Sequence, residues 1–566
     1  MSFDLVVRSG TVVDGSGAPS FRADVGVKGG LITEVGRIGG KGAREVDAEG
    51  RIVTPGFIDV HTHFDAQIHW DPLATGASWH GVTTALMGNC GFTLAPARAN
   101  ARKLVVRNLE RAEDISAAAM EQGIDWTWET YPEYLDALDA LPKGINLGVY
   151  MGHSALRTWA MGEEAFERAA KPDELRVMEQ AVREAMQVGA IGFSTSRSPQ
   201  HETSDDRPVA SRAASWDEVC RLVGVMAESG RGVFELATEP RTSDPAQRAE
   251  SYARMRTLAV TTGRPLTFGL TPATAGSYTV LNEWLNLVDT TAEAGGRVIG
   301  QTHSRDPSLL LSFKSQLPFD NLPEWKDLRA KPLAEQKRLL ADPALRARLV
   351  RIANEGPYPR AISGEARKPQ WDRLHVYDRA LPPYPLVSEV AAAQGMDPVA
   401  LMIEMSVAKD FDCFFLQFLV EQNHDVLLST LKHRNTVMSF SDSGAHVGQI
   451  ADCSIQTFLL AYWVRERQAL GIEEAVRLIT HAPASIFGIE GRGLVRTGMA
   501  ADLNVIDLGR LMPDLPDVAY DIPGGARRLV QGCAGLEATI VGGEVMMQNG
   551  RHAGPLPGRL LRGRRA

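Results

Sequence analysis

Alternating apolar and polar positions mark both ends of the chain. "FDLVVRSGTVVDGSG" and "ADVGVKGGLITEVG" near the start, and "ADLNVIDL" and "ATIVGGEVMMQNGR" near the end, show the two-residue period of half-buried strands, most of them with glycine-containing turns. Strand-rich ends on either side of a long middle predict one small β-sandwich domain made from both termini. We expect this domain to comprise residues 1–54 and 490–566.

Between the two ends, short apolar runs alternate with helical patterns such as "DELRVMEQAVREAMQVGA". Eight strands separated mostly by helices predict the α/β class and a (β/α)8 TIM-like barrel over residues 55–489. The spacing breaks at about 305–430, a stretch that is too long for one crossover and rich in helix formers, so we expect a helical insertion there. The eight strands are expected at residues 52–60, 82–89, 145–151, 187–194, 231–236, 265–270, 297–302 and 436–441.

Composition narrows the range of partners. The 44% hydrophobic and 23% charged residues are typical of a globular protein, which excludes disorder as the main state. A formal net charge of −9 gives no electrostatic reason to bind nucleic acid or an anionic membrane surface. No apolar run approaches the roughly 18 residues of a membrane-spanning helix, and the N-terminus lacks the pattern of a secretory signal. Five scattered cysteines favour a reducing compartment, so we expect a cytoplasmic protein. We also expect it to act on a small-molecule substrate and to be able to form a homo-oligomer.

The strongest local signal is the pair His61 and His63 in "TPGFIDVHTHFD". Residues at i and i+2 of a strand face the same side, so the two imidazoles are placed to bind one metal ion. A chance pair of histidines is the alternative. The position of the pair at the end of the first barrel strand favours the metal.

These features resemble the amidohydrolase superfamily, with its His-x-His on the first strand and its Asp at the end of the last strand. The closer resemblance is to the D-aminoacylase (N-acyl-D-amino-acid deacylase) branch. The more specific stretches for this branch are "GNCG" and "GHSALR". The full set of matching stretches is "VTPGFIDVHTHFD", "GVTTALMGNCG", "MGHSALR", "GAIGFSTS", "SDSGAH" and "GLVRTGMAADLNVID".

The resemblance implies roles for two further residues. Asp442 in "VMSFSDSGAHVG" would be a metal ligand and the general base for an attacking water, and a helix-capping Asp is the alternative. Cys90 in "MGNCG" would be a thiolate ligand to the metal, and a buried free cysteine is the alternative.

The chain departs from the pattern of the family on two strands. The fifth and sixth strands of the family each supply a metal-binding His, but Glu235 stands on the fifth strand here, and Leu270 and Thr271 stand on the sixth. We therefore expect His61, His63 and Asp442 to be the ligands, with Cys90 or Glu235 completing the shell. One zinc ion is favoured over two divalent ions, because three protein ligands leave an open position for water.

Four more residues are candidates for the site. His153 in "MGHSALR" is expected to act in catalysis by polarising a substrate carbonyl, and a structural His is the alternative. His446, four residues after Asp442, and His303 in the seventh strand are candidates for substrate binding. Arg157 is a candidate partner for a substrate carboxylate, and a structural Arg is the alternative.

Together these observations predict a metal-dependent amidohydrolase that cleaves an amide C–N bond, with Asp442 as the general base. The resemblance implies an N-acyl amino acid as the substrate, with the D configuration. The alternatives are a hydrolase of another amide, a cyclic amide, a lactone or an aryl amide. An inactive barrel that serves as a binding or scaffold protein is the alternative from another class.

Overall fold

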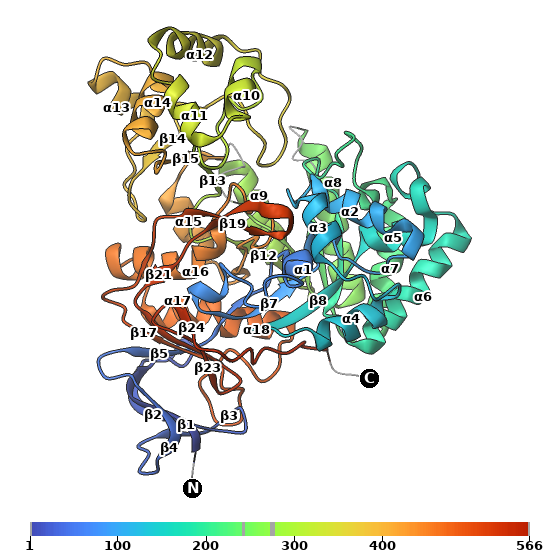
Figure 1. The fold of residues 1–566 in the computed structure, drawn as a ribbon. Helices are drawn as coiled ribbons and strands as arrows, with labels where there is room; N and C mark the ends of the chain where they lie inside the picture. The colour runs from blue at the N-terminus through green and yellow to red at the C-terminus, as the bar shows by residue number, and fades with distance from the viewer. Residues whose placement is uncertain (1–2, 240–243, 272–277, 564–566) are drawn as a thin grey trace.

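The computed structural model describes residues 3–239, 244–271 and 278–563 (Figure 1). Eight strands form one sheet in which every neighbouring pair is parallel. After the first and last strands, the Asp442 amide donates to the His61 carbonyl over 3.1 Å and the His63 amide donates to the Ser443 carbonyl over 2.7 Å. In chain order the strands are β6 (Phe57–Asp59), β7 (Val82–Met87), β8 (Asn146–Gly152), β9 (Gly192–Ser196), β10 (Val233–Ala237), β11 (Leu266–Gly269), β12 (Val298–Thr302) and β16 (Thr436–Met438).

Helices cover the outer face of this sheet because each has one apolar stripe. In α6 the buried residues Leu175, Met178, Val182 and Ala185 recur every three or four positions, which places them along one side. The helices between the strands include α4 (Tyr131–Ala140), α5 (His153–Met161), α6 (Pro172–Val188), α7 (Trp216–Glu228), α8 (Pro245–Thr262), α9 (Tyr278–Glu293) and α15 (His424–Leu431), and α17 (Ile472–Ile479) and α18 (His481–Phe487) follow β16.

Strands from both ends of the chain form a second, nine-stranded sheet, drawn in blue and red at the bottom of Figure 1. The two ends meet where β5 pairs antiparallel with β17, with Val53 opposite Val505. Its strands are β1 (Phe3–Val12), β2 (Phe21–Lys28), β3 (Leu31–Gly36), β4 (Gly42–Asp47), β5 (Ile52–Pro55), β17 (Leu503–Ile506), β22 (Leu536–Val541), β23 (Glu544–Gln548) and β24 (Arg551–His552).

The predicted fold class, an α/β barrel with a β domain from both termini, is confirmed, and all eight predicted barrel strands occur. Two of the ranges differ from the prediction. Residues 52–60 form two strands, β5 and β6, which belong to different sheets. They are separated by Gly56, where a Cβ would lie 2.1 Å from the Thr83 hydroxyl oxygen. Helix α6 continues to Val188 and ends at Gly189, whose φ of 106° suits a glycine, so β9 begins only at Gly192.

The segment between β12 and β16 packs around its own apolar core, which includes Trp325, Leu349 and Phe415. It contains helices, as the sequence pattern predicts, and also a three-stranded antiparallel sheet that the pattern does not predict. In Figure 1 its helices lie at the top, away from the nine-stranded sheet. Its elements are β13 (Ser308–Leu311), α10 (Pro323–Arg329), α11 (Leu333–Leu339), α12 (Pro343–Glu355), β14 (Leu374–Tyr377), α13 (Val387–Ala393), α14 (Pro398–Ala408) and β15 (Phe414–Phe418).

Several shorter elements complete the chain. No helix among the described residues has both the length and the apolar composition needed to cross a membrane. The remaining elements include α1 (Phe64–Gln67), α2 (Arg102–Glu110), α3 (Ala117–Gly123), α16 (Ile455–Phe458), a π-helix at Leu459–Glu466, and the strand pairs β18 (Met512–Pro513) with β21 (Cys533–Ala534) and β19 (Asp517–Ile522) with β20 (Ala526–Val530).

Candidate metal centre

Two histidines and an aspartate meet where the first and last barrel strands end. His61 and His63 follow β6, and their ring centroids lie 5.5 Å apart. Asp442 follows β16, and its Oδ1 lies 3.1 Å from His63 Nε2 and 3.6 Å from His61 Nε2. Both histidines are buried, whereas the Asp442 side chain is 25% exposed. The carboxylate is therefore the member of this group that can be reached from solvent.

Cys90 approaches the same histidines from a tight turn. The turn η2 (Asn89–Gly91) follows β7, and Cys90 adopts the left-handed conformation with a φ of 55°. The Asn89 side-chain amide donates to the Thr62 carbonyl over 3.1 Å, which ties the turn to the end of β6. Cys90 Sγ then lies 3.4 Å from His61 Nε2.

The other nitrogen of His61 is held by a side chain of the seventh strand. His61 Nδ1 lies 2.6 Å from the amide oxygen Oε1 of Gln301, which is an acceptor. Nδ1 therefore carries the proton, and the lone pair of Nε2 faces Cys90 and Asp442. An oriented neutral imidazole of this kind is suited to bind a metal ion.

Two further donors come from loops, and the sequence pattern does not single them out. Glu113 follows α2, and its Oε2 lies 3.5 Å from His63 Nε2. His201 lies in the loop after β9 and stacks at an angle against Phe92. Neither residue has a neighbour in sequence whose spacing would mark it as a ligand.

Metal-donor atoms gather in three overlapping sets among the described residues. Within each set the donor atoms all lie within 4.8 Å of one another, a separation compatible with ligands around a single ion. The sets are His61, His63 and Cys90; His63, Glu113 and Asp442; and Cys90, Glu113 and His201.

Burial and the crowding of carboxylates govern the ionisation of this cluster. Burial, together with the nearby Asp442 carboxylate, raises the pKa of Glu113 to about 8 and that of Glu235 to about 8. Burial alone would lower the pKa of His63, but Glu113 and Asp442 raise it to about 10. Burial would raise the pKa of Asp442, but His63 and His61 hold it below its ordinary value. The cluster thus brings three carboxyl groups, those of Glu113, Glu235 and Asp442, close to the His61 and His63 imidazoles.

Several of these groups lack a hydrogen bond. His63 Nδ1, Glu113 Oε1 and Glu235 Oε1 are buried with no hydrogen-bond partner among the described residues. A buried polar atom without a partner is costly, and a bound cation would remove that cost. The thiol, the imidazoles and the carboxylates together form a donor set that suits zinc.

The structure places Glu235 beside the cluster but outside the three donor sets. Its Oε2 accepts a hydrogen bond from the Cys90 amide over 2.6 Å, and its Oε1 lies 4.0 Å from His61 Nδ1. One carboxylate oxygen of Glu235 thus supports the Cys90 turn, and the other is buried with no hydrogen-bond partner among the described residues, so its role as a ligand stays a prediction. On the sixth strand, Leu270 is buried and apolar, and Thr271 belongs to none of the sets.

His153 and Arg157 lie in a second buried cluster, around Glu218, and their predicted catalytic and substrate-binding roles stay predictions. His153 is 0% exposed, and its two ring nitrogens lie 2.8 Å from Thr195 Oγ1 and 3.0 Å from Glu218 Oε1. Arg157 is equally buried and pairs with the same Glu218 carboxylate. Both ring nitrogens of His153 have partners, whereas Arg157 Nε is buried with no hydrogen-bond partner among the described residues, and both side chains lie outside the three donor sets.

His303 and His446 lie near the cluster but outside the donor sets. The His303 ring stacks on Phe440 with centroids 4.6 Å apart, and the His61 ring contacts Phe440 at 4.1 Å. The His446 amide donates to the Glu113 carbonyl over 2.7 Å. In both histidines Nδ1 is buried and has no hydrogen-bond partner among the described residues.

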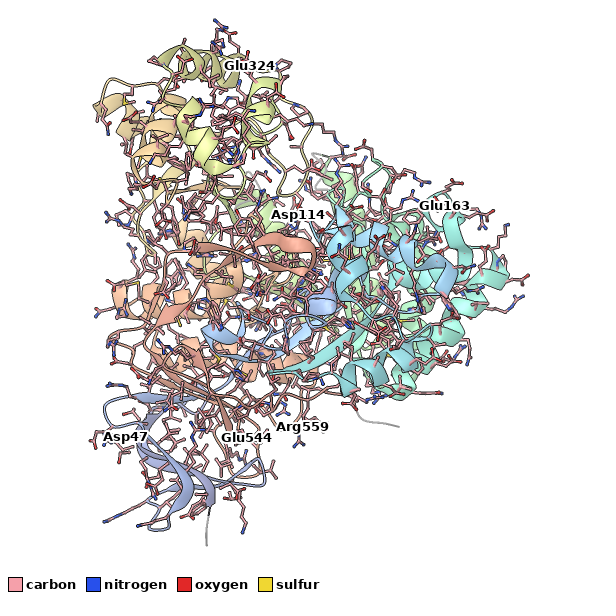
Figure 2. The ribbon with its side chains drawn as sticks, in the orientation of Figure 1. Asp47, Asp114, Glu163, Glu324, Glu544 and Arg559 are labelled. Carbon is pink, nitrogen blue, oxygen red and sulfur yellow. The ribbon has the colours of Figure 1, made fainter. Side chains whose placement is uncertain are left out.

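A cavity of about 330 Å³ is lined by Asp114, the neighbour of Glu113 in sequence, and by Gly444, two residues after Asp442. Gly444 lines it with a φ of 98°, and a Cβ at this position would lie 2.4 Å from the His63 carbonyl oxygen. Asp114, which follows Glu113 in sequence and also lines the cavity, lies near the middle of the molecule in Figure 2, whereas Glu163 and Glu324 lie at its edge. Its wall also includes Gln67, Trp70, Gln449 and Arg527.

Comparison with known proteins identifies the family of the chain. The model of the Amidohydrolase family matches residues 44–547, so the chain belongs to the amidohydrolase family. It is 27% identical over 539 residues to the N-acyl-D-glutamate deacylase of Alcaligenes xylosoxydans xylosoxydans, covering 94% of this chain and 93% of the relative. It is 38% identical over 222 residues to the D-aminoacylase of the same organism, covering 39% of this chain and 42% of the relative.

A solved structure shares the fold. The N-acyl-D-glutamate deacylase of Bordetella bronchiseptica, complexed with zinc and a phosphonate inhibitor, superposes with a TM-score of 0.66 at 23% identity, with 100% of both chains covered. The predicted membership of the amidohydrolase superfamily, with relatives in the D-aminoacylase branch, is confirmed. The chain is a metal-dependent hydrolase that acts on C–N bonds other than peptide bonds.

Proposed function

We propose that this enzyme hydrolyses the amide bond of an N-acyl amino acid, with preference for the D configuration, and that it uses one catalytic zinc ion. The observation that carries the proposal is the buried donor cluster around His63, with the Asp442 carboxylate 3.1 Å from its Nε2. The similarity to a D-aminoacylase and to an N-acyl-D-glutamate deacylase supports the substrate class and its chirality.

The ligands of the zinc ion would be His61, His63 and Cys90, with Asp442 beside them. Two imidazoles and a thiolate suit zinc better than the harder magnesium or calcium ions, which prefer oxygen ligands. A zinc ion bound there supplies a Lewis acid and a water acidic enough to attack near neutral pH.

Asp442 would move the proton. Its ionised carboxylate accepts a proton from the attacking water and passes it to the departing nitrogen, so that the amide and water give a carboxylate and an amine. Its neighbours His61 and His63 hold its pKa low, which keeps the carboxylate ionised and ready to accept. Its partial exposure allows a bound substrate to reach it.

The cavity of about 330 Å³ would hold the substrate, since ligand pockets typically occupy about 300–1,000 Å³. Arg527 lines it and is the candidate to bind the carboxylate of the amino-acid part, because guanidinium and carboxylate groups pair through two parallel hydrogen bonds. In His303 and His446, Nδ1 has no hydrogen-bond partner within the described part of the chain and would be available to a polar group of the substrate.

The direct test is an assay of zinc-loaded enzyme with matched N-acetyl-D- and N-acetyl-L-amino acids, measured by release of the free amine. We expect hydrolysis of the D series with a kcat/KM at least about 100-fold above that of the L series. Methyl esters of the same compounds serve as controls for the carboxylate. Hydrolysis of a cyclic amide or a lactone without cleavage of either N-acetyl series would contradict the proposal.

A further inference from the structure

We infer that a small primary amine binds, as its ammonium ion, in a buried cavity beside Asp306, where the insertion meets the barrel. Asp306 lies between β12 and β13 and lines a cavity of about 10 Å³. This space holds one group of about the size of a water molecule, which is the size of an ammonium headgroup. None of the described residues that line it belongs to the three donor sets, so the site goes beyond the proposed reaction.

The first support is the Asp306 carboxylate, which has no counter-charge. The residue is 2% exposed, and both carboxylate oxygens are buried with no hydrogen-bond partner within the described ranges. The guanidinium of the adjacent Arg305 is bound elsewhere, by Asp452 Oδ1 at 2.9 Å and by the Ala451 carbonyl at 2.6 Å. A buried carboxylate in this state is costly, and a bound cation would remove that cost.

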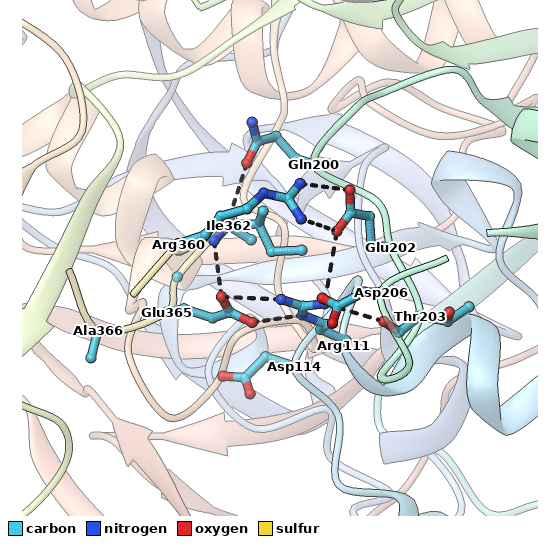
Figure 3. A network of polar contacts seen from close by, with 12 residues as sticks. Arg111, Asp114, Gln200, Glu202, Thr203, Asp206, Arg360, Ile362, Glu365 and Ala366 are labelled. Atoms are coloured by element: carbon cyan, nitrogen blue, oxygen red, sulfur yellow. Dashed lines mark hydrogen bonds and ion pairs between the residues drawn. The ribbon is translucent and has the colours of Figure 1, made fainter. Parts of the chain in front are cut away.

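Other carboxylates of the chain have the partner that Asp306 lacks. In the network of Figure 3, Arg360 donates to both carboxylate oxygens of Glu202, at 2.7 and 2.9 Å. In the same network Arg111 pairs with Glu365 at 2.7 Å. The side chains of Glu202 and Glu365 are 10% and 33% exposed, so they need a counter-charge less than the more deeply buried Asp306 does. A ligand can supply the positive charge there.

The second support is the aromatic wall of the cavity. The negative faces of aromatic rings attract cations, so rings around a carboxylate favour an ammonium ion over a neutral group. The Tyr462 and Trp463 rings meet edge to face with centroids 5.1 Å apart, and Trp463 Nε1 donates to the Ser304 carbonyl over 2.6 Å, which fixes the indole. The aromatic side chains that line the cavity are Tyr384, Phe418, Phe458, Tyr462 and Trp463.

The third support is the helix that carries two of these rings. Tyr462 and Trp463 belong to the π-helix Leu459–Glu466, and the Tyr462 hydroxyl lies 3.0 Å from His424 Nδ1 on α15. Turns of π-helix are rare and occur frequently at functional sites. No residue of this helix belongs to the donor sets found among the described residues, so the metal centre does not account for it.

The fourth support is a larger cavity that adjoins the inner one. It has a volume of about 700 Å³, and its wall includes the exposed side chains of Arg379 and Glu466, so it reaches the surface. A ligand whose ammonium group lies at Asp306 can place its carbon chain in this outer cavity. The two cavities share the residues Pro382, Tyr384, Gln422, His424 and Tyr462.

The inner cavity selects among cations by chemistry and by size. A metal ion needs several donor atoms, and Asp306 belongs to no group of three or more metal donors among the described residues. The three methyl groups of a quaternary ammonium ion exceed a space of about 10 Å³. A primary ammonium ion meets both limits, because its N–H groups donate to the two Asp306 oxygens and its head is small.

The test is calorimetric titration of the zinc-loaded enzyme with n-butylammonium chloride at pH 8, in a buffer without amines. Burial raises the pKa of Asp306 to about 7, so both partners are charged at this pH. We expect one site with a Kd of about 1 mM or lower, and binding at least about 10-fold weaker in Asp306→Asn. Asp372→Asn, which changes an exposed aspartate of the insertion, should bind as the wild type does. Equal affinities of Asp306→Asn and the wild type would overturn the inference.

Related ligands and a second variant sharpen the result. Butanol, which lacks the charge, should not bind, and butyltrimethylammonium should bind at least about 10-fold more weakly than butylammonium. Tyr462→Leu removes one ring and should weaken binding about 5-fold, and Phe418→Leu stands in if circular dichroism shows that Tyr462→Leu is unfolded. Displacement of butylammonium by potassium chloride, with sodium chloride as the ionic-strength control, would assign the site to an inorganic cation and overturn the amine.

Thermal unfolding gives a second readout. Butylammonium should raise the Tm of the wild type at pH 8 and leave that of Asp306→Asn unchanged, because a ligand stabilises only the state that binds it. An equal rise in both proteins would place the amine at another site. Binding that is lost when zinc is removed, but kept in Asp306→Asn, would place it at the metal centre and would likewise overturn the inference.

Discussion

Two buried polar clusters lie in the same barrel, and they differ in how far the oxygens of their carboxylates have hydrogen-bond partners. Around Glu218, one carboxylate oxygen binds His153 and Arg157, and the other accepts the Ala170 amide over 3.2 Å. Around His63, by contrast, the His63 ring and the Glu113 carboxylate retain buried atoms without a hydrogen bond among the described residues.

The residue types alone do not tell which cluster is structural and which is functional, whereas the hydrogen-bond partners of the carboxylates do. Both clusters contain histidine and glutamate near strand ends, and both are buried. Both oxygens of the Glu218 carboxylate have hydrogen-bond partners, although Arg157 Nε has none among the described residues. Glu113 and Glu235 each keep one buried carboxylate oxygen without a partner there, which favours a bound cation. We therefore interpret the Glu218 cluster as structural and the His63 cluster as the candidate metal centre.

The largest expected effect comes from the general base. Asp442→Asn should lower kcat by about 10³-fold, since a carboxylate that moves a proton in the transition state contributes on that order. The measurement is steady-state turnover of an N-acetyl-D-amino acid, with circular dichroism as the folding check. Asp412→Asn, which changes an exposed aspartate, should match the wild type. Turnover within a few-fold of the wild type in Asp442→Asn would remove Asp442 as the base.

A substitution in the Glu218 cluster should have the opposite effect, lowering stability and leaving turnover unchanged. Glu218→Gln leaves the Arg157 charge buried without its partner, so we expect the free energy of unfolding to fall by about 3–5 kcal/mol. Turnover per folded molecule should stay close to the wild-type value. Denaturant unfolding measures the first quantity, and Glu228→Gln, an exposed site on the same helix, is the control. A large loss of kcat with unchanged stability would make this cluster catalytic instead.

Asp306 is a buried carboxylate that lacks hydrogen-bond partners in the described part of the chain but lies outside the candidate metal centre. Both of its carboxylate oxygens are buried without a hydrogen bond among the described residues, but it belongs to no donor set. Burial raises its pKa to about 7. Because the pKa is higher in the folded state, its contribution to stability is complete below the ordinary value near 4 and is lost as the pH rises through about 7.

Asp306→Asn should therefore stabilise the protein at pH 8 by about 2–4 kcal/mol relative to the wild type and have little effect at pH 4. Thermal unfolding at the two pH values measures this, with the exposed Asp372→Asn as the control. An equal effect at both pH values would mean that Asp306 does not change protonation on folding.

The smallest expected effect concerns recognition of the substrate. Arg527→Met should raise KM for N-acetyl-amino acids by about 10-fold, because one charge-assisted pair contributes about 1.4 kcal/mol or more. The methyl esters of the same substrates should show no change in KM. Equal losses for acids and esters would mean that Arg527 does not bind the carboxylate.

Features of the fold and site that depend on the local sequence pattern could be predicted from the sequence. The strands follow from short apolar runs, and the pair His61 and His63 follows from its i, i+2 spacing on one of them. Asp442 follows from its place at a strand end together with the family resemblance. In the insertion, β13 and β14 pair with β15 from distant parts of the sequence, and such pairing leaves no local period to read.

The site was predictable only in part, because side-chain partners depend on the tertiary fold. His153 stands next to a strand end, as a catalytic residue would, yet its ring meets Glu218 on another helix. Glu113 and His201 come from loops with no spacing signal, and only the folded chain brings their donor atoms together with Cys90.

The most direct test of the metal centre is the zinc content of enzyme purified without added metal, compared with that of His63→Ala. At least one zinc ion per chain in the wild type, with the catalytic ion lost in the variant, is the expected result. A wild type that contains no metal, and takes none up from excess Zn²⁺, would contradict the assignment of the His63 cluster as a metal centre.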